Sequence, residues 1–240
     1  MVREIGNLSL LGFVDGITAT GIIISSIIFG IISFYHAKKL EAKLLGIAGL
    51  CMIFIGLLYL GPATDFFMVL LTGENLDPPH LYGWLSYVWI FPGVICAFYL
   101  GAELIVPGKK KTIVTTYTIL AFIFVALIFT MPIGEGGVWV FNDIEEGDLI
   151  DSGFNRTNPA FWLMILFLIS MLMFLAIGFF IKARQATGEL RKKFSYLGLG
   201  FLVFFICGVA DALFLPGVYL AIWRGAMMTF ALWMYLGLKT

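Results

Sequence analysis

The sequence predicts an all-α membrane protein built as a bundle of seven transmembrane helices. Hydrophobic residues make up 61% of the 240 residues and charged residues only 12%, whereas soluble domains have about 45–50% and about 25%. Seven apolar stretches approach or exceed the ~20 residues that a helix needs to cross the hydrocarbon of a bilayer. Basic residues gather in alternate connectors between these stretches. All three observations are typical of a multi-pass membrane protein.

The chain is expected to form one membrane domain over residues 1–240, because each polar stretch is too short to bury a core of its own. The apolar run that begins near residue 10 is too long for a signal peptide and ends in lysines, so we take it as the first span. We place the seven spans at about 10–35, 44–63, 82–106, 112–132, 159–181, 194–215 and 217–238.

Two prolines interrupt these stretches. The second span either kinks at Pro62 and continues to about Leu71, or residues 66–71 lie flat at the membrane interface. The sequence leaves both alternatives open. Pro92 lies inside the third span and predicts a kink, because proline has no N–H to donate.

The charges predict the orientation of the chain. Basic residues are retained on the cytoplasmic side of a membrane. Arg3 and Arg156 are the only basic residues in the remaining connectors and the N-terminal segment, which carry nine acids besides Asp65. We therefore expect the N-terminus outside, the C-terminus in the cytoplasm and the protein in the plasma membrane. The connectors after the first, third, fifth and seventh spans hold twelve of the fifteen basic residues: Lys38, Lys39, Lys43, Lys109, Lys110, Lys111, Lys182, Arg184, Arg191, Lys192, Lys193 and Lys239.

The longest connector, residues 133–157, predicts a short extracellular β-hairpin between the fourth and fifth spans. Two segments near 138–143 and 148–152 have strand character and flank a turn at 145–147. The connector is acidic, but its spacing does not fit a calcium-binding EF-hand loop.

A faint internal similarity links spans 1–3 with spans 5–7. The glycines Gly46 and Gly56 match Gly198 and Gly208, ten residues apart in each case. Either the chain contains a three-plus-one-plus-three duplication or these are the small-residue pairs common in membrane helices.

The intramembrane charges are the strongest candidates for a functional site. Asp211 and Arg224 flank a predicted turn at 216–217, at depths of roughly 7 and 12 Å in adjacent antiparallel helices. Asp15 and Asp65 are expected at comparable depth. Charged residues within a membrane usually face the bundle interior and have partners. The four residues therefore predict an outward-facing ligand or ion pocket of net charge −2; the alternative is a purely structural salt bridge.

At the inner end, Glu103 precedes Lys109, Lys110 and Lys111. It is expected to pair with a lysine near the headgroups or to act, together with these three lysines, in coupling to a cytoplasmic partner. No histidine or cysteine set has metal-ligand spacing, and no nucleophile–base set is evident. We expect no metal, no cofactor and no enzymatic activity.

The seven-helix layout, the basic turn FYHAKKLEAK at residues 34–43 and the short C-terminal segment resemble a known group of proteins. They are similar to the seven-helix sensor regions of archaeal and bacterial membrane histidine kinases and to uncharacterised stand-alone archaeal seven-helix proteins. The resemblance implies sensing without a catalytic motif of the chain's own. A retinal protein is excluded, because the last span has no lysine before Lys239.

We therefore expect a sensor-like or receptor-like protein that signals through a separate cytoplasmic partner. A small ion, proton or solute transporter, or a channel subunit, is the alternative. The expected partners are the lipid bilayer, a cytoplasmic signalling protein and further copies of the chain, and neither nucleic acid nor retinal.

Overall fold

The computed structural model describes residues 8–141, 148–213 and 218–239, and 81% of the chain is helical. In this part of the chain, six helical segments are long and apolar enough to cross a membrane. They overlap the first six predicted spans, which confirms the all-α membrane character. The six segments are Leu10–Leu40, Lys43–Thr72, His80–Ile105, Pro107–Thr130, Pro159–Gln185 and Gly188–Asp211. The seventh predicted span consists of two shorter helices, α10 and α11.

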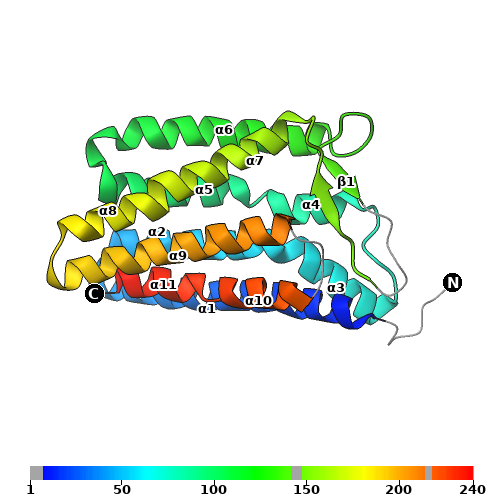
Figure 1. Ribbon diagram of the computed structural model, residues 1–240, viewed down its shortest axis with the longest axis horizontal. Coiled ribbons are helices and arrows are strands. Elements are labelled where there is room, and N and C mark those ends of the chain that lie inside the picture. Colours follow the sequence, from blue (N-terminus) through cyan, green and yellow to red (C-terminus); the bar gives the residue numbers. More distant parts are fainter. Residues whose placement is uncertain (1–7, 142–147, 214–217, 240) are drawn as a thin grey trace.

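Consecutive spans are neighbours in space, and the seventh span returns to the first, so the bundle is a closed ring. Its helices run along one common direction, and the described ends of the chain lie at opposite ends of the bundle (Figure 1). The helices are α1 (Leu10–Leu40), α2 (Lys43–Gly56), α3 (Leu60–Thr72), α4 (His80–Tyr87), α5 (Ile90–Ile105), α6 (Lys110–Thr130), α7 (Pro159–Ser170), α8 (Ile177–Gln185), α9 (Gly188–Leu213), α10 (Val218–Met227) and α11 (Phe230–Leu238).

The two prolines perturb their helices differently. Before Pro62 the second span tightens into a 3₁₀ turn at Leu57–Tyr59, and α3 then continues to Thr72, so the continuous alternative is the one observed. Pro92 cannot donate to the carbonyl of Val88. The third span is broken there between α4 and α5, and Phe91 N–H donates to Val88 O at 3.3 Å.

Two further helical irregularities occur where the sequence has no proline. The fifth span contains a π-helical segment at Met171–Ala176, between α7 and α8. The seventh span is interrupted at residues 228–229, between α10 and α11. Both lie within apolar runs whose sequence predicts regular helix.

The connector between α6 and α7 holds two short strands, β1 (Trp139–Phe141) and β2 (Ser152–Phe154), which pair antiparallel. The first strand falls in its predicted range, but the prediction of a second strand at 148–152 was wrong for most of that range. Leu149 and Ile150 are buried instead, 6% and 2% exposed, and the N–H of Ile150 bonds to a side chain. The predicted turns at 145–147 and 216–217 lie outside the described residues.

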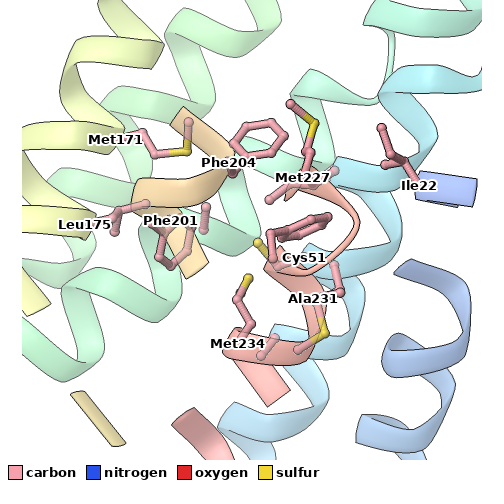
Figure 2. Packing of buried hydrophobic residues seen from close by; sticks show 14 of the residues in the cluster. Ile22, Cys51, Met171, Leu175, Phe201, Phe204, Met227, Ala231 and Met234 are labelled. Carbon is pink, nitrogen blue, oxygen red and sulfur yellow. The ribbon is translucent and has the colours of Figure 1, made fainter. Parts of the chain in front are cut away.

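The core is one large apolar cluster to which α1, α2, α5, α9 and α11 all contribute, together with the π-helical segment (Figure 2). A second cluster joins α4, α5, α6, α7 and β1. Large apolar side chains are also exposed on the sides of the bundle, along the length of its helices, for example Ile24, Phe122 and Ile169. Such faces match the hydrocarbon that surrounds a membrane protein.

Helices α1 and α2 approach so closely that glycine is required at their contact. A Cβ on Gly49 would lie 2.8 Å from the carbonyl oxygen of Gly30. We predict that Gly49→Ala lowers the stability of the purified protein by about 1–3 kcal/mol, because the helices must separate. The measurement is thermal unfolding in detergent.

Gly225→Ala is the matched control, because its Cβ would meet nothing within 4 Å. Its stability should be unchanged or higher, since alanine favours helix over glycine by about 1 kcal/mol. Equal melting temperatures for the two variants would contradict the close packing of α1 on α2.

Candidate functional site

A buried arginine on α10 joins three helices. Arg224 is only 6% exposed. Its Nε donates to Asp211 Oδ1 on α9 at 2.9 Å. Its Nη1 forms an ion pair with the Asp15 carboxylate on α1 and also donates to the Asp15 backbone carbonyl at 3.1 Å. A single guanidinium therefore holds the N-terminal part of α1, the C-terminal part of α9 and the helix α10 in one arrangement.

A tyrosine from the second span completes this cluster. The Tyr59 hydroxyl donates to Asp211 Oδ2 at 2.9 Å, so both oxygens of that carboxylate are occupied. The Arg224 guanidinium carbon lies 5.2 Å from the centroid of the Tyr59 ring, within cation–π range. Tyr59 ends the 3₁₀ turn that precedes Pro62. We call Asp15, Tyr59, Asp211 and Arg224 the outer cluster, and the two ends of the bundle outer and inner, after the orientation that the charges of the sequence predict.

The outer cluster has more acid than base. Two carboxylates share one guanidinium, which gives a net charge of −1 when both are ionised. The side chains of Asp15 and Asp211 are 14% and 17% exposed, against 7% for Arg224. A surplus carboxylate with little access to water is costly. Uptake of a proton or of a cationic group is the chemistry that would neutralise it.

Asp65 has a different role from the one expected. Its side chain is fully buried and accepts three hydrogen bonds: from Leu76 N–H at 2.7 Å, from Ile150 N–H at 2.8 Å and from the Asn75 amide at 3.1 Å. The structure thus joins three of the four predicted pocket residues directly and gives Asp65 separate partners. The expected charge of −2 for one pocket becomes −1 for the outer cluster.

Asp65 anchors a cap over the outer end of the bundle. The Asn75 amide also donates to the carbonyl of Asp148 at 3.2 Å, and the Ser9 hydroxyl donates to the Asp148 carboxylate. Leu149 packs with Phe66 and Val69 of α3 in a small apolar cluster. The connector between α6 and α7 is therefore tied to α3, to the loop after it and to the start of α1.

Apolar side chains close the outer cluster on its inner side. Met227 lies one turn after Arg224 and is fully buried in the large core cluster. Figure 2 shows Met227 packed among Ile22, Cys51 and Phe204, with Ala231 and Met234 beyond them. The outer cluster thus borders the large apolar core cluster.

The inner end holds two polar contacts between neighbouring spans. Lys110 Nζ lies 2.7 Å from Glu103 Oε2 and 4.9 Å from the Tyr99 ring centroid. The expected pairing of Glu103 with a lysine is therefore present, while Lys109 and Lys111 are exposed. The Tyr235 hydroxyl lies 2.9 Å from His36 Nδ1, joining α11 to α1. No pattern in the sequence predicts this second contact.

Protein-family models and curated protein sequences were compared with the chain, and none matches it. Within the described residues, no group of three histidine, cysteine or acidic side chains is arranged to hold a metal ion.

We predict that Arg224→Met strongly destabilises the protein. The substitution keeps the aliphatic part of the side chain but leaves the Asp15 and Asp211 carboxylates without their cation. Removing one partner of an ion pair in the protein interior typically costs about 3–5 kcal/mol. The measurement is unfolding of the purified protein in detergent. Arg156→Met, at an exposed position, is the control and should melt like the wild type. Adding Asp15→Asn and Asp211→Asn should recover part of the loss; no recovery would show that the carboxylates do not depend on Arg224.

We predict that Asp65→Asn loosens the cap without unfolding the bundle. An asparagine side chain presents only one acceptor oxygen to three donors, and hydrogen bonds to charged groups contribute about 1.5–3 kcal/mol each. Limited proteolysis of residues 148–157 should become at least about tenfold faster. Asp77→Asn, an exposed acid in the neighbouring loop, should leave the cleavage rate unchanged. Equal rates for the two variants would contradict the anchoring role of Asp65.

Proposed function

We propose that the protein is a sensor-like or receptor-like integral membrane protein of the plasma membrane. Its N-terminus lies outside, its outer cluster responds to a ligand, a cation or a proton, and a separate cytoplasmic protein receives the signal. The observation that carries the proposal is the position of the outer cluster. It ties α10 to α1 and α9 directly above the interruption of the seventh span.

The interruption makes α10 and α11 separate units. Met228 N–H still bonds to Arg224 O, but the next residue, Thr229, bonds to Ala226 O in a tighter turn. The carbonyl of Met228 accepts a hydrogen bond from the Ser25 hydroxyl of α1 at 2.7 Å. Arg224 lies one turn before this interruption, and the Ser25 hydroxyl of α1 bonds to the interruption itself. A change in the pairing of Arg224 would therefore act next to the point where α10 and α11 meet.

The lower half of the seventh span reaches the inner end of the bundle. Helix α11 packs against α1, α2 and α9, and Tyr235 contacts His36 near the end of α1. A ligand that competes for Arg224 would free α10 from α1 and α9, and α11 would transmit the change inward. Such coupling needs only two packings of one element with different affinity for the ligand.

The apolar core supports sensing over transport. A transporter needs a polar path from both sides, yet Leu175, Phe201 and Met234 below the cluster are 0–1% exposed and tightly packed. The resemblance to sensor regions of histidine kinases points the same way. Transport of a proton or cation is the second candidate, favoured by the surplus carboxylate of the outer cluster.

We predict that Asp211→Asn alters the inner end of the bundle. The amide keeps the shape of the side chain but weakens the hold on Arg224, so α10 and α11 should shift by about 1–5 Å, as helices do in switching proteins. Spin labels at Lys39→Cys and Lys239→Cys, in a chain whose three cysteines are replaced, would report this distance in reconstituted membranes.

Glu74→Gln, which neutralises an exposed acid at the outer end, is the control and should leave the distance unchanged. Identical distance distributions for Asp211→Asn and the wild type would refute coupling through the seventh span. A proton or cation flux in proteoliposomes that Asp211→Asn abolishes would establish transport instead.

A further inference from the structure

The hairpin formed by α8 and α9 extends beyond the other helix ends at the C-terminal end of the bundle (Figure 1). Its tip is a tight connection of two residues, 186–187, followed by Gly188 at the start of α9. Gly188 has a φ of 59°, a conformation that glycine adopts without strain. We define the hairpin tip as residues 184–192. Apart from Ala186, its side chains are exposed.

The hairpin tip and its flanks are strongly basic. Residues 182–193 contain five basic residues and one acidic residue, a net charge of +4. In the part of the chain that the structure describes, none of these five cations forms an ion pair. Lys110, by contrast, is already engaged by Glu103 at another inner connector. The hairpin therefore offers the charge that an acidic surface would meet.

An apolar side chain lies within this charge. Leu190 is 54% exposed and stands in the sequence GELRKK, next to Arg191 and Lys192. An exposed leucine close to cations in the chain is a suitable anchor, because the apolar group supplies affinity and the charges supply orientation and association rate.

Helix α9 links this surface directly to the outer cluster. It runs without interruption from Gly188 to Leu213, so Asp211 and Leu190 belong to one helix and lie about 30 Å apart along it. The third, fifth and seventh spans are all broken or distorted between their ends. Any tilt of α9 that follows a change at Asp211 therefore moves the hairpin tip.

We propose that the hairpin tip is the docking surface for a separate cytoplasmic protein, which presents an acidic surface around an apolar pocket. This inference rests on the proposed function and names the place and chemistry of its output. A protein fits better than lipid headgroups, because the tip extends past the ends of α2 and α6, whose lysines mark the headgroup level (Figure 1).

The first experiment is site-specific photocrosslinking of the full chain in its native cells. A photoreactive amino acid replaces Leu190, or Leu40 as the control, which is 48% exposed at the end of α1. We expect one discrete protein adduct at position 190 and none at position 40. Adducts at position 190 with lipid alone, with a second copy of the chain or with nothing would overturn the proposal.

The second experiment tests the chemistry with the crosslinked protein, purified and titrated against the full chain in nanodiscs. Arg191→Glu with Lys192→Glu should raise Kd at least tenfold, and added salt should raise Kd for the wild type. The control pair Lys109→Glu with Lys111→Glu makes the same charge change elsewhere on the inner face and should leave Kd within twofold. Equal effects of the two pairs would overturn the proposal; thermal melting confirms that each variant is folded.

The two proposals fail separately. If the partner binds the wild type and Asp211→Asn alike, and the inner-end distance does not change, then docking stands and sensing fails. If Asp211→Asn shifts the inner-end distance but position 190 gives no protein adduct, then sensing stands and docking fails.

Discussion

The structure depends on the neutralisation of one arginine inside a membrane-spanning bundle. A charge at the centre of a membrane helix costs about 2.5–3.5 kcal/mol on insertion scales. Arg224 meets this cost with carboxylates from α1 and α9. Because each contact requires its partner at the same depth, the arginine fixes the vertical register of the first, sixth and seventh spans relative to one another.

Three aspartates, Asp15, Asp65 and Asp211, bind different kinds of partner through the same functional group. Asp211 and Asp15 face a cation, whereas Asp65 faces backbone and amide N–H groups and ties down the outer connectors. The division separates the bundle into an outer half with polar contacts under a cap and an inner half of packed apolar side chains. Under the proposed function, a signal that begins in the outer half would therefore travel as movement of helices.

The spans could be predicted because the bilayer imposes a length and an apolar composition on every helix that crosses it. The contact of Asp211 with Arg224 could also be predicted, because the depth of both residues in the membrane is counted from the same predicted turn. Tyr59 was missed because the 3₁₀ turn rotates the side chains that follow it. The partners of Asp65 are largely backbone N–H groups, and because every residue except proline has one, the sequence could not predict which would bind it. The interruptions at 171–176 and 228–229 contain no proline, so the sequence did not predict them.

The separation of the cluster's partners along the chain bears on how the protein enters the membrane. Asp211 and Arg224 are 13 residues apart on adjacent helices, whereas Asp15 is 209 residues from Arg224. The last two spans can thus be inserted as one hairpin whose charges already compensate each other. Asp15 becomes bound only when this hairpin closes the ring against α1, so completion of the bundle and formation of the three-way ionic contact are the same event in biogenesis.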